Sequence, residues 1–170
     1  MSDDGHRLDP SQRRAWLAYM RVYHRLEYEM NRQLQSDSGL SLADYTVLNA
    51  LTNAPRDRAQ VNVLATTVGW ERSRLSHHLQ RMSRRGLVER LESDGDRRAT
   101  DVVLTDHGRL EFEAAAPAHA AWIKELFFTD LDAAQENALA DVLEAAYESI
   151  LRHGTLPRPQ IDEDLRSQQP

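Results

Sequence analysis

The sequence predicts a mainly α-helical fold with a small β-wing, in which a winged helix-turn-helix head is joined to long terminal dimerisation helices. Three observations support this fold class. Two short amphipathic helical segments flank Gly69, in the order of a helix-turn-helix. A strand, turn and strand pattern follows over residues 87–104, as in a β-hairpin. Both ends of the chain carry apolar residues at helical spacing over more length than a small head can cover.

The composition narrows the functional class. A chain of 170 residues favours one domain with a buried core and makes a second, catalytic domain unexpected. The lack of cysteine excludes disulfides, zinc knuckles and thiol switches. The sequence contains no Gly-rich phosphate loop, zincin motif or Ser-His-Asp arrangement, so we expect no enzyme, cofactor or metal site. Without a secretory segment or a long apolar run, we expect a cytoplasmic protein with no membrane partner.

A long first helix is predicted to begin at Pro10. Asp9 is its expected cap, Gln12 lies in capping-box register, and the segment 36–39 ends it. Roughly 26 residues of helix would be about 39 Å long, longer than the head requires. Its apolar stripe comprises Trp16, Tyr19, Met20, Tyr23, Leu26, Met30 and Leu34.

The next helix is predicted to belong to the core of the head. Ser41 and Asp44 repeat the capping-box pattern, and Pro55 stops the helix. Residues 55–60 are charged and turn-like. We expect Val61 in a strand of one or two residues and Asn62 as the cap of the following helix.

The helix-turn-helix is predicted over residues 62–85, with Gly69 at its corner. Its expected inner face comprises Leu64, Val68, Leu75, Leu79 and Met82. A helical wheel of the second helix places Ser73, His77, Gln80 and Arg84 on the opposite face, with Arg74, Ser76 and Arg81 on its shoulders. Those polar side chains have no core to enter.

A β-hairpin wing is predicted after Gly86, which suits the left-handed end of a helix. Residues 87–91 and 102–104 have strand composition, and residues 93–96 supply turn chemistry. Arg97 and Arg98 therefore lie at or just past the predicted tip.

Two further helical regions complete the chain. Thr105 is the expected cap of a helix running to about residue 128, in which Pro117 favours a kink over a split. Asp132 and Gln135 start the last helix, which continues to Gly154.

Positive charge is concentrated in the predicted head. Residues 56–109 hold 11 arginines against 8 acidic residues, whereas the remainder holds 10 basic residues against 19 acidic ones. A basic segment in an acidic chain indicates phosphate attraction at one place. This pattern predicts a head that reads double-stranded DNA.

Two motifs within this order of elements resemble the MarR family of bacterial transcriptional regulators. DGDRRATDVVLTDHG, from Asp94 to Gly108, is similar to the wing of the family, and SRLSHHLQRMSRRGLVER, from Ser73 to Arg90, is similar to its recognition helix. The resemblance covers about residues 10–154. It implies a homodimeric, sequence-specific DNA-binding regulator, expected to be a ligand-responsive repressor, that binds a pseudo-palindromic operator.

The resemblance also implies roles for individual residues. Arg98 would enter the minor groove, Asp96 would orient it, and Arg97 would meet phosphate. The expected major-groove and phosphate contacts are Ser73, Arg74, Ser76, His77, Arg81 and Arg84. The implied organisation is a disordered N-terminus over 1–9, a single domain over 10–154 and a flexible tail over 155–170; within the domain, 10–38 and 105–154 are dimerisation helices and 41–104 is the head.

Several alternatives stay open at this point. Arg84 and Arg85 either complement the helix dipole or contact phosphate, and His77 and His78 are interpreted as a solvated pair. Four aromatic residues either line a pocket for a small-molecule effector or belong to the core. They are Trp16, Tyr19, Tyr23 and Tyr45. The alternative function is a winged-helix module that binds protein without binding DNA, and an enzyme on a helical scaffold is a third hypothesis.

Overall fold

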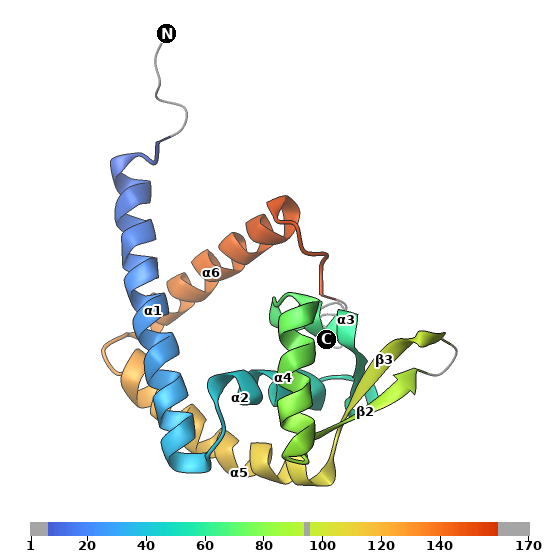
Figure 1. Cartoon of the computed structure of the whole chain (residues 1–170). Coiled ribbons are helices and arrows are strands. Elements are labelled where there is room, and N and C mark those ends of the chain that lie inside the picture. The colour runs from blue at the N-terminus through green and yellow to red at the C-terminus, as the bar shows by residue number, and fades with distance from the viewer. Residues whose placement is uncertain (1–6, 94–95, 160–170) are drawn as a thin grey trace.

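The computed structural model describes residues 7–93 and 96–159, with the side chains of residues 96–98 outside the described part. It confirms the predicted class: a helical protein with a small winged head (Figure 1). The head comprises α2 (Leu42–Thr52), η2 (Pro55–Asp57), β1 (Arg58–Gln60), α3 (Val61–Val68), α4 (Arg72–Arg84), β2 (Val88–Ser93) and β3 (Asp96–Leu104). The remaining elements are α1 (Pro10–Ser38), α5 (Asp106–Ile123), the π-helix η3 (Lys124–Phe128) and α6 (Ala133–His153).

The long helices begin where the capping residues predict. Asp9 and Gln12 form a reciprocal capping box on α1, with the Gln12 amide 2.9 Å from Asp9 Oδ1. Asp132 and Gln135 repeat the arrangement on α6. The hydroxyl of Thr105 accepts a hydrogen bond from the third residue of α5. Each cap satisfies backbone N–H groups that lack an intrahelical partner.

The start of α3 corrects one prediction. Asn62 is not the cap: the helix begins at Val61, Gln60 occupies the cap position without a side-chain hydrogen bond, and Val61 is helical. The strand lies earlier, because β1 pairs antiparallel with β3, aligning Gln60 with Asp101. This pairing with a distant segment ends the extended conformation at Gln60, and a local capping pattern does not contain that information.

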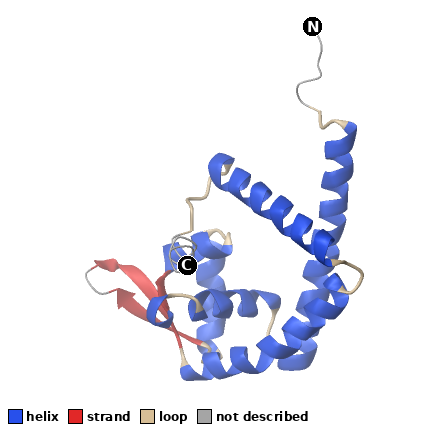
Figure 2. Cartoon of the chain, turned by 180° about the vertical axis from the view of Figure 1, so that it is seen from behind, coloured by secondary structure: helices blue, strands red, loops and turns tan. Residues whose placement is uncertain are grey.

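A three-stranded sheet in the order β1-β3-β2 lies beside the helical core of the head (Figure 2). Of the predicted inner positions, Val68 is half-buried and the other four are fully buried. Leucines from α1, the turn after it and α2 complete the core: Leu34, Leu40, Leu48 and Leu51.

The helix α5 continues through Pro117 to Ile123, so the proline does not split it. Because proline has no N–H, a backbone carbonyl in the preceding turn of α5 lacks its helical donor. Pro117 is exposed, so water can hydrogen-bond to the backbone there. No helix in the described ranges is both long and apolar enough to cross a membrane.

Substitution of Gly108 by alanine is expected to destabilise the head by about 3 kcal/mol. Gly108 lies in the first turn of α5, where an added Cβ would overlap the carbonyl oxygen of Leu87 and lie 2.9 Å from its carbonyl carbon. Backbone cannot move aside as a flexible side chain can. Urea denaturation measures the loss, with His107→Ala, at an exposed neighbouring position, as the matched control. Equal stability of the two variants would contradict this close approach.

Candidate nucleic-acid interface

The helix α4 presents the predicted recognition face to solvent. Gly69, at φ +68°, makes the corner that separates α3 from α4, and Leu75, Leu79 and Met82 hold the inner side of α4 in the core. The opposite side carries exposed Ser73, Arg74, His77, Gln80, Arg81 and Arg84, with Ser76 half-buried. The fold therefore gathers the predicted α4 contacts on one helix, beside the wing (Figure 1).

Arg74 stacks on an aromatic ring at the helix-turn-helix corner. Its guanidinium carbon lies 4.4 Å from the centroid of the Trp70 ring, a cation–π geometry that restricts an otherwise mobile side chain. The Trp70 ring meets the His78 ring edge-on, with centroids 5.5 Å apart. Arg74 is thus exposed to solvent and at the same time packed against the Trp70 ring.

The interpretation of His77 and His78 as a solvated pair is wrong for His78. His77 is exposed, but the His78 side chain is only 8% exposed. Its Nε2 lies 3.1 Å from Asp44 Oδ1, and its Nδ1 lies 2.9 Å from a guanidinium nitrogen of Arg81. Residue 78 is three after Leu75 and four before Met82, so helical spacing alone could have placed it inward.

Arg85 makes contacts that neither of its predicted roles includes. One of its guanidinium nitrogens donates to Asp44 Oδ2 at 2.7 Å, and another donates to the carbonyl of Gly39 at 3.1 Å. These contacts tie the end of α4 to the turn between α1 and α2. Arg84 remains exposed, available to the helix dipole or to phosphate.

Asp44 is the shared partner of these side chains. It is buried at the start of α2, where its Oδ2 also accepts the backbone N–H of Ser41 at 2.9 Å. Burial alone would raise the pKa of the Asp44 carboxyl, but the adjacent His78 imidazole and hydrogen bonds from Ser41 and Arg85 outweigh it and hold the pKa well below its ordinary value of 3.8. The carboxylate is therefore ionised throughout the physiological range.

Asp44→Asn is expected to cost roughly 2 to 3 kcal/mol of stability at neutral pH, because a buried acceptor of charge-assisted hydrogen bonds is lost. The lowered pKa makes this contribution complete above pH 3.8 and progressively smaller as acid protonates the folded state. Denaturation at pH 7, 3 and 2 should therefore show the wild type and the variant converging in acid. Asp130→Asn, at an exposed position, is the control, and a pH-independent difference would contradict this account.

The wing is longer than predicted. β2 extends to Ser93 and β3 begins at Asp96, so the backbone of Arg97 and Arg98 occupies the second and third positions of β3. The predicted turn residues Asp94 and Gly95 lie outside the described residues, as do the side chains of residues 96–98. The predicted pairing of Asp96 with Arg98 therefore concerns side chains outside the described part.

Asp101 is a second buried carboxylate that was not predicted from the sequence, and its hydrogen bonds stabilise the wing. Asp101 of β3 accepts hydrogen bonds from Arg58 of β1 at 2.6 Å and from Ser93 of β2 at 2.7 Å. Gln60 donates to the Ser93 hydroxyl at 3.2 Å. Because these side chains come from all three strands, they join the wing to the body of the head. Residue 101 is polar within an otherwise apolar strand end, which is the signal that could have identified it.

The four aromatic residues considered for an effector pocket separate into two groups. Tyr45 packs in the head, with ring centroids 5.0 Å from Phe112 and 4.7 Å from His119. His119 Nδ1 lies 2.6 Å from Gln33 Oε1, and burial lowers the pKa of this histidine. The other three are exposed along α1. Tyr45 is thus partly buried and packs against the core.

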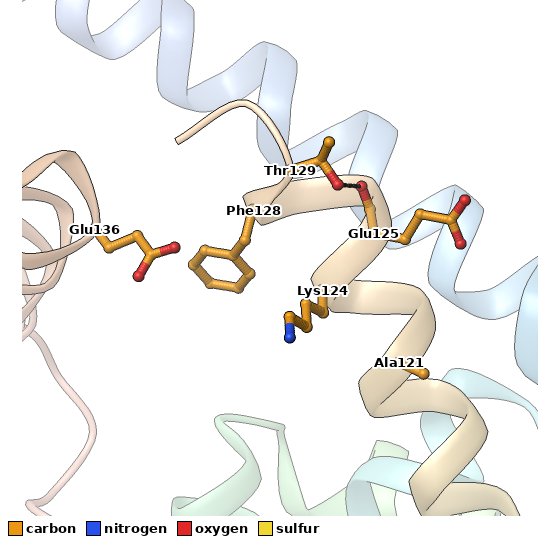
Figure 3. A pocket seen from close by; sticks show the side chains of 6 residues that line it. All are labelled: Ala121, Lys124, Glu125, Phe128, Thr129 and Glu136. Carbon is orange, nitrogen blue, oxygen red and sulfur yellow. Dashed lines mark hydrogen bonds between the residues drawn. The ribbon is translucent and has the colours of Figure 1, made fainter. Parts of the chain in front are cut away.

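An open groove of about 710 Å³ lies between η3 and α6, and its lining includes none of those four aromatic residues (Figure 3). Phe128 and Lys124 of η3 face Glu136 of α6 across it. Its lining comprises Ala121, Lys124, Glu125, Phe128, Thr129 and Glu136. Among the described residues, no group of three histidine or acidic side chains is arranged to hold a metal ion.

Comparisons with known proteins agree with this geometry. A family model described as MarR family matches residues 38–99. The uncharacterised HTH-type transcriptional regulator YdgJ of Bacillus subtilis (strain 168) is 27% identical over 111 residues, which span 65% of this chain and 66% of that protein.

Two solved structures from Streptomyces coelicolor match nearly the whole fold. Sco3205, a MarR family transcriptional regulator in complex with DNA, is 29% identical with a TM-score of 0.83, covering 92% of this chain and 98% of that chain. AbsC, a MarR family transcriptional regulator, is 31% identical with a TM-score of 0.78, covering 85% of this chain and 97% of that chain. The chain therefore belongs to the MarR family and is a DNA-binding transcriptional regulator, not an enzyme.

Proposed function

We propose that the protein is a ligand-responsive repressor that binds a pseudo-palindromic operator as a homodimer in the cytoplasm. The observation that supports it best is the exposed face of α4 beside a braced wing. A helix of this kind fits the major groove, where its side chains reach base edges and flanking phosphates. The proposed contacts on α4 are Ser73, Arg74, Ser76, His77, Arg81 and Arg84.

The wing would contact the neighbouring minor groove. The backbone of β3 carries Arg97 and Arg98 immediately past the tip of the hairpin. A narrow minor groove concentrates negative potential and attracts a guanidinium. We assign this contact to Arg98, with Asp96 orienting it and Arg97 meeting phosphate.

The homodimer is supported by the apolar surface of the terminal helices. α6 has 21 residues and buries none of them in the single chain. Val142 and Ile150 are each 64% exposed, and α1 exposes Trp16, Tyr19 and Tyr23. Apolar surface of this extent on a regulator marks an association interface. We therefore assign 10–38 and 105–154 to dimerisation, and 41–104 to DNA binding, within one domain over 10–154.

We propose that a small-molecule ligand regulates DNA binding. A chain with no cysteine has no thiol with which to sense oxidation. A small-molecule effector is therefore the expected signal. Its binding would act by favouring one spacing of the two heads over another.

Selection of bound genomic fragments followed by a salt titration tests the DNA-binding proposal. We expect two half-sites centred about 10 base pairs apart and an affinity that falls steeply with salt as phosphates release counterions. Arg81→Ala should reduce the salt slope by about one, whereas Arg152→Ala, at an exposed position on α6, should leave it unchanged. A slope of zero for the wild type, or an operator with one half-site, would overturn the proposal.

A further inference from the structure

His78 makes a different contact with each of its two ring nitrogens. Nδ1 is 2.9 Å from a guanidinium nitrogen of Arg81, on the same helix one turn later. Nε2 is 3.1 Å from Asp44 Oδ1, on α2. The imidazole thus lies between a buried carboxylate and an exposed arginine of the recognition face.

The chemistry of the two neighbours determines where the imidazole proton lies. A guanidinium has only donors, so Nδ1 must accept from Arg81 and cannot carry hydrogen. The ring hydrogen is then on Nε2, which lies 3.1 Å from Asp44 Oδ1 and has no hydrogen-bond partner of correct geometry among the described residues. Arg85 and Ser41 hold that carboxylate from its other oxygen. The contact with Arg81 therefore determines the tautomer of the ring, and the neighbouring Asp44 carboxylate helps to determine its position.

The same ring supports a second arginine through Trp70. The edge-on contact of His78 with the indole, at 88° between the ring planes, fixes the indole on which the Arg74 guanidinium lies. Arg74 and Arg81 are both exposed, so neither would hold one conformation unaided. The buried His78 thus contacts Arg81 directly and Arg74 through the Trp70 ring.

We propose that His78, oriented by Asp44, is a positioning residue that holds Arg81 and Arg74 in the conformations that meet DNA. This inference rests on the proposed function, because it takes Arg81 and Arg74 as DNA contacts. His78 itself is buried and would not touch DNA. Its effect is to remove conformational freedom from two long side chains before binding, so that less entropy is lost on the operator.

Two substitutions distinguish the contributions of the two ring nitrogens of His78. In His78→Asn the amide oxygen takes the place of Nδ1 and accepts from Arg81, while the side chain is too short to reach Asp44. In His78→Gln the amide nitrogen takes the place of Nε2 and reaches Asp44, while no acceptor faces Arg81. We expect His78→Gln to weaken operator binding about fivefold and His78→Asn to weaken it less, because Asn still accepts from Arg81 although it loses the contact with Trp70.

A double-mutant cycle with Arg81→Ala tests whether the effect passes through Arg81. The loss caused by His78→Gln should be smaller in the Arg81→Ala background, where only the part that passes through Trp70 and Arg74 remains. An equal loss in both backgrounds, or equal losses for the Asn and Gln variants, would overturn the inference. Thermal unfolding of each variant shows whether it is folded. If none of the His78 variants folds, the tautomer of His78 in the wild type decides: imidazole NMR shifts should show hydrogen on Nε2, and hydrogen on Nδ1 would overturn the inference.

The same data separate this inference from the proposed function. Weaker binding by Arg98→Ala together with unchanged binding by Arg81→Ala would overturn the positioning role and leave DNA binding intact. Unchanged binding by both variants would overturn the proposed interface itself.

Discussion

Replacing Val142 and Ile150 together by glutamate is expected to make the protein monomeric and to weaken operator binding about a hundredfold or more. Both side chains are 64% exposed on α6 in the single chain, where the proposed partner would cover them. Four carboxylates in one symmetric apolar interface would be desolvated without partners, which costs more than the interface can supply. A monomer then binds one half-site and loses the gain from simultaneous engagement of two.

Light scattering at micromolar concentration and an operator titration measure the two effects. The matched control is the pair Ala133→Glu and Asn137→Glu, which adds the same charge at exposed positions on the opposite face of α6. It should remain dimeric and bind the operator. A dimeric mass for the Val142 and Ile150 variant with wild-type affinity would place the interface elsewhere.

Arg98→Ala is expected to weaken operator binding by about ten- to a hundredfold, the loss of one specific contact of roughly 1 to 3 kcal/mol. A guanidinium in a narrow minor groove responds to groove width, so the loss should be largest for A·T-rich flanks. Arg97→Ala serves as the comparison: it should weaken binding to all sequences similarly and reduce the salt slope by about one.

Competition titrations with operator and unrelated DNA distinguish the two arginines. If Arg98→Ala retained the full affinity and sequence preference of the wild type, the alternative function would gain support, a winged-helix module that recognises protein. The mass of the dimer should not change in either variant, since both residues lie in the wing.

Local patterns predicted most of this fold because they act within a few residues. The capping boxes at Asp9 and Asp132 place their helices correctly, and the spacing of Leu75, Leu79 and Met82 identifies the buried side of α4. The start of α3 could not be predicted in this way, since it depends on β1 pairing with a strand about forty residues later.

The exposed positions of the candidate site could be predicted from the sequence, whereas the buried side chains that support them could not. Exposure follows from periodicity, so the exposed polar positions on the far face of α4 were predicted correctly, whereas the burial of His78 was not. Asp44 is recognisable in the sequence only as a capping residue, which it is. That Arg85 and His78 also converge on it depends on how α2 packs against α4, and one sequence does not show that packing. Asp101 and Arg58, 43 residues apart, were missed for the same reason.

The arrangement around His78 constrains how the sequence preference of this regulator can change. Ser73 and His77 are exposed on α4, and neither takes part in the contacts that the His78 ring makes with Arg81, Asp44 and Trp70. Each is therefore open to independent replacement. Arg74 and Arg81 share one support and are coupled through it. A new operator read at either of these two positions would require compensating changes at the other, at Trp70 or at His78. Divergence of specificity, or its redesign in the laboratory, should therefore proceed one residue at a time on one part of the helix and only in sets on the other.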